Sequence, residues 1–173
     1  MNTEITLSVI KTEQDSTVDI QNAIEAGFGE FDRIVETYTR FAPTSELSEL
    51  NRNSGSWQAV SAEFYHLIST MLELSELTEG AFDPTVIDFL ETYGYDPSYD
   101  FSKLDNPDLN SLVSKMANDR SSWREIELDP QNLKVKLATG QRIHLGGIGK
   151  GYAIDKAYEK LDRFEHFIIN AGG

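Results

Sequence analysis

The sequence predicts an α+β fold in which helices pack on a mainly antiparallel sheet. Apolar residues recur every three or four positions from Ile20 to Tyr38, which is typical of an amphipathic helix, and residues 126–137 alternate with a period of two, which indicates a β-hairpin. With 39% hydrophobic and 25% charged residues, the 173-residue chain has the composition of an ordinary folded domain. We therefore expect residues 1–173 to form a single domain with one core.

The first half of the chain consists of short periodic patterns separated by breaks. A loose alternation at 4–10 predicts an opening strand. We expect a long helix that begins at Ser16 and Asp19 and reaches Tyr38, and a short helix at 45–51. A third helix is expected to begin after the cap residue Ser61 and to end at Gly80. The third helix has an apolar face made of Phe64, Leu67, Ile68, Met71 and Leu72.

The second half adds two more helix signals before the pattern changes to strands. Asp83-Pro84 predicts a helix that ends at Gly94, and Asn106-Pro107-Asp108 predicts another that continues to Met116. The hairpin turns at 129–132. A strand at 142–145, a helix from Tyr152 to Leu161 and a strand at 167–169 would then form a strand-helix-strand unit.

The charge of the chain disfavours two classes of partner. The formal net charge is −14, which disfavours nucleic acid and anionic membrane surfaces. Residues 131–173 are the exception, with 7 basic against 4 acidic side chains. The chain has no cysteine, no apolar run as long as the roughly 18 residues of a membrane span, and no start typical of a signal peptide. Cytoplasmic residence is the default expectation, with a processed exported form as the alternative.

The strongest candidate site is the glycine-rich segment 146–151, Gly-Gly-Ile-Gly-Lys-Gly. Its glycines let the backbone approach a ligand, the following helix offers unpaired N–H groups, and Lys150 adds a positive charge, a combination suited to phosphate. The spacing differs from the Walker and Rossmann motifs. The alternative is a tight turn between strand and helix that binds nothing.

The second candidate is Gly80-Ala81-Phe82-Asp83-Pro84-Thr85. Asp83 would accept hydrogen bonds from a ligand, or it would only cap the following helix. Phe82 would lie beside a flat ring, or it would be part of the core. The three histidines are too far apart along the chain to predict a histidine metal site, and no nucleophile-elbow motif is present, so the catalytic residues are unknown at this level.

Four motifs, in this order along the chain, resemble those of the FAD:protein FMN transferase family, known as ApbE. They are residues 38–51 (YTRFAPTSELSELN), 80–85 (GAFDPT), 145–155 (LGGIGKGYAID) and 169–173 (INAGG). The resemblance covers the whole chain and implies an ApbE-like α+β fold. Because four linked motifs agree, the resemblance is far more specific than the glycine loop alone.

The resemblance implies a magnesium-dependent enzyme that cleaves the pyrophosphate of FAD. Such enzymes attach FMN through a phosphodiester to a threonine or serine of an acceptor flavoprotein, and some members instead hydrolyse FAD to FMN and AMP. Carried over residue by residue, the FAD contacts would be Met1, Phe41, Ala81, Phe82, Asp83, His144 and Lys150, and the carbonyl of Gly147 would be a ligand of Mg2+.

Three positions depart from the family pattern. His144 stands where the family has an aspartate, Phe41 where it has a tyrosine, and Asn2 where it has a glycine. The rest of the family sequence follows the Asn-Ala-Gly-Gly motif and holds an aspartate and a threonine of the magnesium site. We therefore expect residues 1–173 to be the N-terminal part of a truncated or divergent member, without the family's C-terminal part.

Three other interpretations stay open at the level of sequence. In the first, the chain is a non-catalytic module that binds FAD or another nucleotide. In the second, it is a relative of the FAD pyrophosphatases. In the third, it is an acidic interaction domain whose glycine loop is only structural.

Overall fold

The computed structural model describes residues 3–96, 98, 101–105, 107–119 and 122–172. The chain divides into two units, Met1–Thr39 with Gly146–Gly173, and Arg40–Leu145, and each is described by itself. That residues 1–173 form a single domain stays a prediction. In the described residues, no helix has the length and apolar character needed to cross a membrane.

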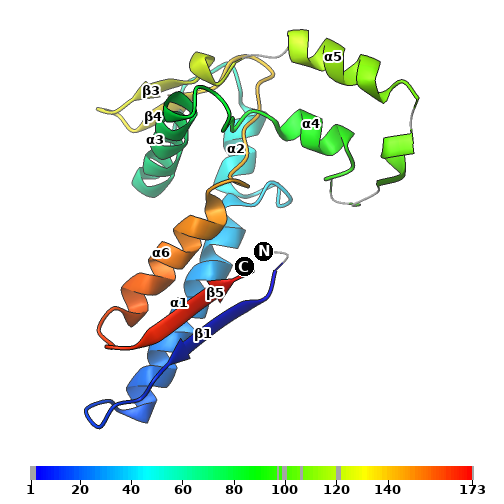
Figure 1. Ribbon diagram of the computed structural model, residues 1–173. Helices are drawn as coiled ribbons and strands as arrows, with labels where there is room; N and C mark the ends of the chain where they lie inside the picture. The colour runs from blue at the N-terminus through cyan, green and yellow to red at the C-terminus, as the bar shows by residue number, and fades with distance from the viewer. Residues whose placement is uncertain (1–2, 97, 99–100, 106, 120–121, 173) are drawn as a thin grey trace. The chain divides into compact units, whose positions relative to one another are not determined.

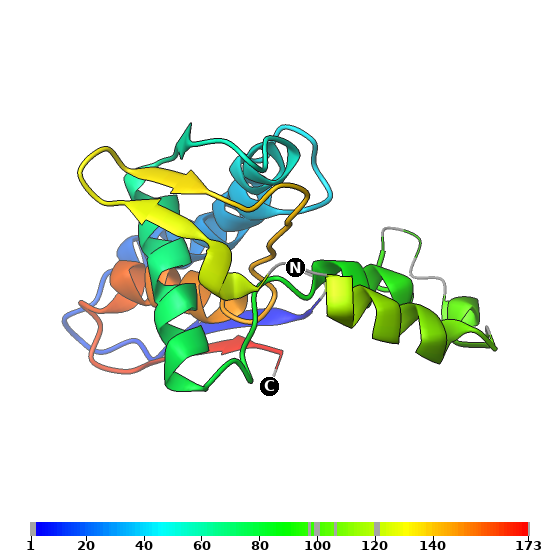
Figure 2. The ribbon, with the colours of Figure 1, turned by 90° about the horizontal axis from the view of Figure 1, so that it is seen from above.

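The first unit is a two-stranded antiparallel ribbon with two helices over one face (Figures 1 and 2). The strands pair in register from Ile5 opposite Ala171 to Val9 opposite Phe167. The two helices pack closely at Gly27, where a Cβ atom would lie 3.8 Å from the Cβ atom of Ala157 in the other helix. The same atom would lie 2.9 Å from the side chain of Leu7 in the ribbon. The elements of this unit are β1 (Ile5–Val9), α1 (Thr17–Tyr38), α6 (Gly149–Leu161) and β5 (Phe167–Ala171).

The apolar stripe of α1 follows the predicted spacing from Ile20 to Tyr38, except that Phe28, which that spacing places on the apolar face, is exposed. Its buried residues are Ile20, Ala23, Gly27, Phe31, Ile34 and Tyr38. The start of the helix is also correct, because Ser16 is extended at the N-cap position, but its side chain makes no capping hydrogen bond. The predicted capping role of the Ser16 hydroxyl is therefore wrong, and α1 depends on burial of its apolar stripe.

The second unit combines helices with a small antiparallel sheet in the order β2-β4-β3. The predicted hairpin is confirmed, with Leu128 opposite Val135. Trp123 precedes it in a short 3-10 helix rather than in a strand. The elements are α2 (Glu46–Arg52), β2 (Gln58–Ala59), α3 (Ala62–Leu77), α4 (Ile87–Thr92), α5 (Leu109–Asp119), β3 (Glu127–Asp129) and β4 (Lys134–Lys136), with 3-10 helices at Phe101–Asp105 and Trp123–Glu125.

Serine side chains cap both α2 and α3, and the cap of α3 is the one predicted at Ser61. The Ser45 hydroxyl accepts a hydrogen bond from the backbone N–H of Ser48 at 3.0 Å, and the Ser61 hydroxyl accepts one from Phe64 at 3.1 Å. The carboxylate of Glu46 accepts bonds from both the N–H and the hydroxyl of Ser61. One carboxylate therefore joins the first turn of α2 to the start of α3.

Three predicted boundaries are corrected. Residues 142–145 are not a strand, and the partner of β5 is β1, so the predicted strand-helix-strand unit does not form. The helix after Asp83-Pro84 begins only at Ile87, and α6 begins at Gly149 instead of Tyr152. The strand β2, of two residues, was not predicted because two residues carry no periodicity. The α+β class with antiparallel pairing is confirmed.

Candidate functional site

A tight turn holds Asp83. Its Oδ1 atom accepts hydrogen bonds from the backbone N–H of Thr85 at 2.8 Å and from the Thr85 hydroxyl at 2.6 Å. Thr85 and Pro84 are buried, whereas Asp83 is half-buried. Because α4 begins four residues after Asp83, this carboxylate shapes a turn and does not cap the helix.

His144 lies beside this turn, although 60 residues separate it from Pro84 along the chain. Its backbone N–H donates to the carbonyl of Pro84 at 3.0 Å. Burial lowers the pKa of the imidazole below its ordinary value, the charge of Arg40 lowers it further, and the charge of Asp83 opposes both effects. The structure thus brings together Asp83 and His144, two of the predicted FAD contacts.

Two further predicted contacts belong to the same unit and present aromatic rings. The guanidinium carbon of Arg40 lies 4.4 Å from the centroid of the Phe41 ring, a cation–π arrangement, and Phe41 is 46% exposed. Phe82 is half-buried and Ala81 is exposed, so neither belongs to the buried core. These side chains are accessible to a ligand.

The glycine-rich segment belongs to the other unit. Residues 146–148 form a turn, and α6 begins at Gly149, so Lys150 lies in the first helical turn. Lys150 is exposed and has no ion-pair partner among the described residues. A Cβ atom at Gly151 would meet nothing within 4 Å. The start of α6 therefore presents a cation and uncovered backbone.

A metal site is only partly provided for. The carbonyl of Gly147, the predicted Mg2+ ligand, accepts no hydrogen bond from the described residues, so its oxygen is not engaged within this part of the chain. Among all the residues that the structure describes, no group of three or more His, Asp or Glu side chains could hold a metal ion. These residues do not fit a complete magnesium site by themselves. Met1, the remaining predicted FAD contact, lies outside the described residues.

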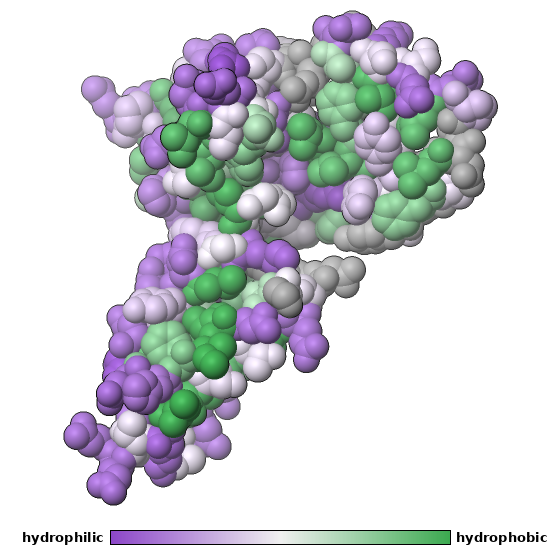
Figure 3. All heavy atoms as spheres, in the orientation of Figure 1, coloured by the Kyte–Doolittle hydropathy of each residue, from purple (hydrophilic) through white to green (hydrophobic). Residues whose placement is uncertain are grey.

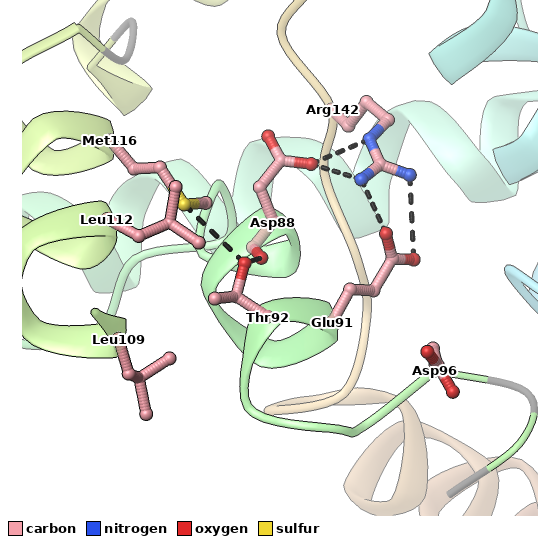
Figure 4. Close-up of a pocket in the computed structure, with 8 residues that line it drawn as sticks. All are labelled: Asp88, Glu91, Thr92, Asp96, Leu109, Leu112, Met116 and Arg142. Atoms are coloured by element: carbon pink, nitrogen blue, oxygen red, sulfur yellow. Dashed lines mark hydrogen bonds and ion pairs between the residues drawn. The ribbon is translucent and has the colours of Figure 1, made fainter. Parts of the chain in front are cut away.

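Sequence reasoning missed the role of Arg142. Its guanidinium pairs with Asp88 and, at 2.6 Å, with Glu91, both on α4 (Figure 4). Glu91 also pairs with Arg40 at 3.1 Å, so one carboxylate joins two arginines. No sequence signal pointed to this network, because its members lie about 50 residues apart and match no short motif.

The same arginine borders a pocket in this unit. It has a volume of about 540 Å³ and combines the α4 carboxylates with apolar side chains of α5, including Leu112 and Met116 (Figure 4). Figure 3 shows polar and apolar residues side by side over α4 and α5. A smaller pocket of about 210 Å³ has Arg40, Asn51, Arg52 and Arg142 in its wall.

The lowered pKa of His144 predicts a dependence of stability on pH. The unfolded chain takes up this proton near pH 6.5, at a higher pH than the folded chain does. The free energy of unfolding should therefore be unaffected by His144 above about pH 6.5 and should fall as the pH drops below it. Urea unfolding at a series of pH values measures the slope. His144→Gln should reduce this slope, and a slope equal to that of the parent would contradict the assignment.

Comparison with known proteins identifies relatives of the whole chain. Residues 1–173 match the ApbE family. A Haemophilus influenzae protein described as FAD:protein FMN transferase is 27% identical over 160 residues, which are 87% of this chain and 43% of that protein. The crystal structure of the ApbE protein of Thermotoga maritima is 29% identical, with a TM-score of 0.79 over 96% of this chain and 52% of its own.

A more distant structure agrees in fold. The flavin transferase ApbE of Vibrio cholerae is 21% identical, with a TM-score of 0.77 over 100% of this chain and 55% of its own. The chain thus spans about half the length of the relatives that it matches. Since the family match extends from the first residue to the last, the chain belongs to the ApbE family.

Proposed function

We propose that this chain binds FAD as part of an FAD:protein FMN transferase that acts on an acceptor flavoprotein. The observation that carries the proposal is the start of α6, where exposed Lys150 and the uncovered backbone at Gly151 offer the positive charge and close approach that a pyrophosphate requires. We take FAD as the proposed substrate because of the similarity to the Haemophilus influenzae protein described as FAD:protein FMN transferase. The other proposed FAD contacts are Met1, Phe41, Ala81, Phe82, Asp83 and His144.

The proposed reaction is a phosphoryl-group substitution. A threonine or serine hydroxyl of the acceptor attacks the phosphorus on the FMN side of the pyrophosphate, the bond to the bridging oxygen breaks, and AMP leaves. The hydroxyl loses its proton, and FMN becomes joined to the acceptor through a phosphodiester. In this scheme Lys150 binds the phosphate oxygens and offsets their negative charge. No residue of the chain is assigned as the base.

A requirement for Mg2+ is part of the proposal. The carbonyl of Gly147 would supply one oxygen ligand, and phosphate oxygens of FAD would supply others. The described residues contain no group of carboxylates that could hold a metal ion. This observation favours a second candidate function, in which the chain binds FAD or another nucleotide without transferring FMN.

Titration of the chain with FAD tests the binding proposal. We expect Lys150→Ala to weaken FAD binding by about tenfold or more, since a hydrogen bond to a charged group contributes about 1.5–3 kcal/mol. Lys156→Ala is the matched control on the same helix, because Lys156 is paired with Glu159 at 2.6 Å, and its FAD affinity should stay within about twofold of the parent. Absence of FAD binding, or equal weakening in both variants, would reject the proposal.

A second assay separates transfer from binding. The chain is mixed with FAD, Mg2+ and a threonine-bearing acceptor protein, and both acceptor-bound flavin fluorescence and released AMP are measured. Transfer predicts both signals, pyrophosphatase activity predicts AMP and free FMN without labelled acceptor, and a binding module predicts intact FAD.

A further inference from the structure

The segment 141–144 runs through the second unit without a partner strand, and side chains hold it in place. The Gln141 carboxamide donates to the carbonyl of Ser122 at 2.8 Å. Arg142 is held by the two carboxylates of α4. The next residue, Ile143, is fully buried and is held by a different group, the carboxamide of Asn51.

Asn51 binds both backbone groups of Ile143. Its Oδ1 atom accepts from the Ile143 N–H at 2.8 Å, and its Nδ2 atom donates to the Ile143 carbonyl at 2.9 Å. This two-bond pattern gives Ile143 the same pair of hydrogen bonds that an antiparallel strand would give it. One side chain therefore replaces the missing strand at the residue directly before His144.

The carboxamide of Asn51 has a firm support. Asn51 belongs to α2, whose residues Leu47 and Leu50 are each only 1% exposed. The carbonyl of Leu50 accepts a bond from the Gln58 side chain at 3.0 Å, which ties the helix to β2. Because both the helix and its apolar side are held, the position of Asn51 defines the position of the Ile143 peptide.

The position of Ile143 in turn defines the surroundings of His144. The His144 N–H bonds to Pro84, and the charged groups that act on its imidazole are Arg40, before α2, and Asp83, before α4. Arg40 is itself paired with Glu91 of α4. A shift of the backbone at 143–144 would change the distances from the imidazole to both charges and the depth of its burial.

We propose that Asn51 is a positioning residue of the FAD site: its carboxamide fixes the Ile143 peptide, so that His144 stays next to Asp83 in the geometry that receives FAD. The part that concerns FAD rests on the proposed function. The part that concerns His144 stands on the hydrogen bonds alone and is tested separately.

The experiment compares Asn51→Ala, Asn51→Asp and Asn53→Ala in the full chain. Asn53 is the matched control, because its carboxamide is exposed and donates to the Glu49 carbonyl and to the Gln58 side chain of β2, not to the segment 141–144. NMR measures the exchange rate of the Ile143 amide and the titration of the His144 imidazole. The imidazole signal of His144 is assigned as the one that is absent from the spectrum of His144→Gln. FAD affinity is measured by titration.

In Asn51→Ala we expect at least about tenfold faster exchange of the Ile143 amide, since its acceptor is lost. The pKa of His144 should move up toward its ordinary value of 6.5, and FAD should bind about tenfold more weakly. Asn51→Asp keeps the acceptor oxygen, so it should keep the amide protected while losing the bond to the Ile143 carbonyl. If Asn51→Ala does not fold, this isosteric variant carries the test through its FAD affinity, which should fall about tenfold; its His144 titration is not used, because the added carboxylate itself raises the pKa of a nearby imidazole. Asn53→Ala should match the parent in all three measurements.

The outcomes are distinguishable. An unprotected Ile143 amide with an unchanged His144 titration would overturn the positioning role and leave Asn51 as a structural residue only. A shifted His144 titration in a chain whose parent form does not bind FAD would support the positioning of His144 and reject the proposed function. Equal FAD affinity in the parent and Asn51→Ala would overturn the link between Asn51 and the FAD site.

Discussion

Replacing Phe64 with alanine is expected to lower the free energy of unfolding by about 3–5 kcal/mol, the usual cost of removing a fully buried aromatic side chain. Phe64 is 0% exposed and belongs to the buried face of α3, with Leu67, Ile68 and Met71. Its backbone N–H bonds to the Ser61 cap, and this bond survives the substitution. The loss therefore reports the side chain alone.

Urea unfolding followed by circular dichroism measures this effect. Leu77→Ala at the other end of α3 is the matched control, because Leu77 is 79% exposed and its removal should change stability by no more than about 0.5 kcal/mol. Since domains are commonly stable by only 5–15 kcal/mol, Phe64→Ala should unfold a measurable fraction of the protein at moderate temperature. A loss no larger than that of Leu77→Ala would show that α3 does not pack as described.

Replacing Asp83 with alanine is expected to lower the free energy of unfolding by about 2 kcal/mol or more. The substitution removes the acceptor for the N–H and the hydroxyl of Thr85. Thr85 is only 5% exposed, so both groups lose this acceptor where little water can replace it. Asp96→Ala is the control: the same pair of bonds joins Asp96 to Ser98, but in an exposed turn, and the loss should be well below 1 kcal/mol.

Asp83→Asn separates the shape of this turn from its charge. The asparagine keeps an oxygen at the Oδ1 position, so stability should stay within about 1 kcal/mol of the parent. The negative charge that raises the pKa of His144 is lost, and that pKa should fall further below its ordinary value. NMR titration of His144 measures the change. A pKa that does not move would show that Asp83 and His144 are not electrostatic neighbours in solution.

The parts of the fold that were predicted from the sequence depend on local signals. The stripe on α1, the Ser61 cap of α3 and the β3–β4 hairpin each depend on only a few consecutive turns or residues. The error at 142–145 has the opposite origin. An apolar alternation there predicted a strand, but the groups that bind Ile143 come from Asn51, 92 residues earlier, and no local pattern encodes a side chain that replaces a strand.

The candidate site was predictable to a similar extent. The glycine spacing and Lys150 predict a phosphate site without any alignment, and that site stays a prediction. The start of α6 lies three residues before the predicted one, because glycines suggest a loop. The proximity of His144 to Asp83 had no local signal, since it arises from a hydrogen bond to Pro84 across the fold. The ion pairs of Arg142 with Asp88 and Glu91 could not be predicted either, because they join residues that are far apart along the chain.

At Gly151, the requirements of stability and of ligand binding favour different residues. Within a helix, glycine is less favourable than alanine by up to about 1 kcal/mol, and no described atom near Gly151 forbids a methyl group. The first turn of α6 is therefore a site of local frustration, where the residue that best stabilises the native state is not the one present. Stabilising substitutions there are the ones that we expect to conflict most directly with ligand binding.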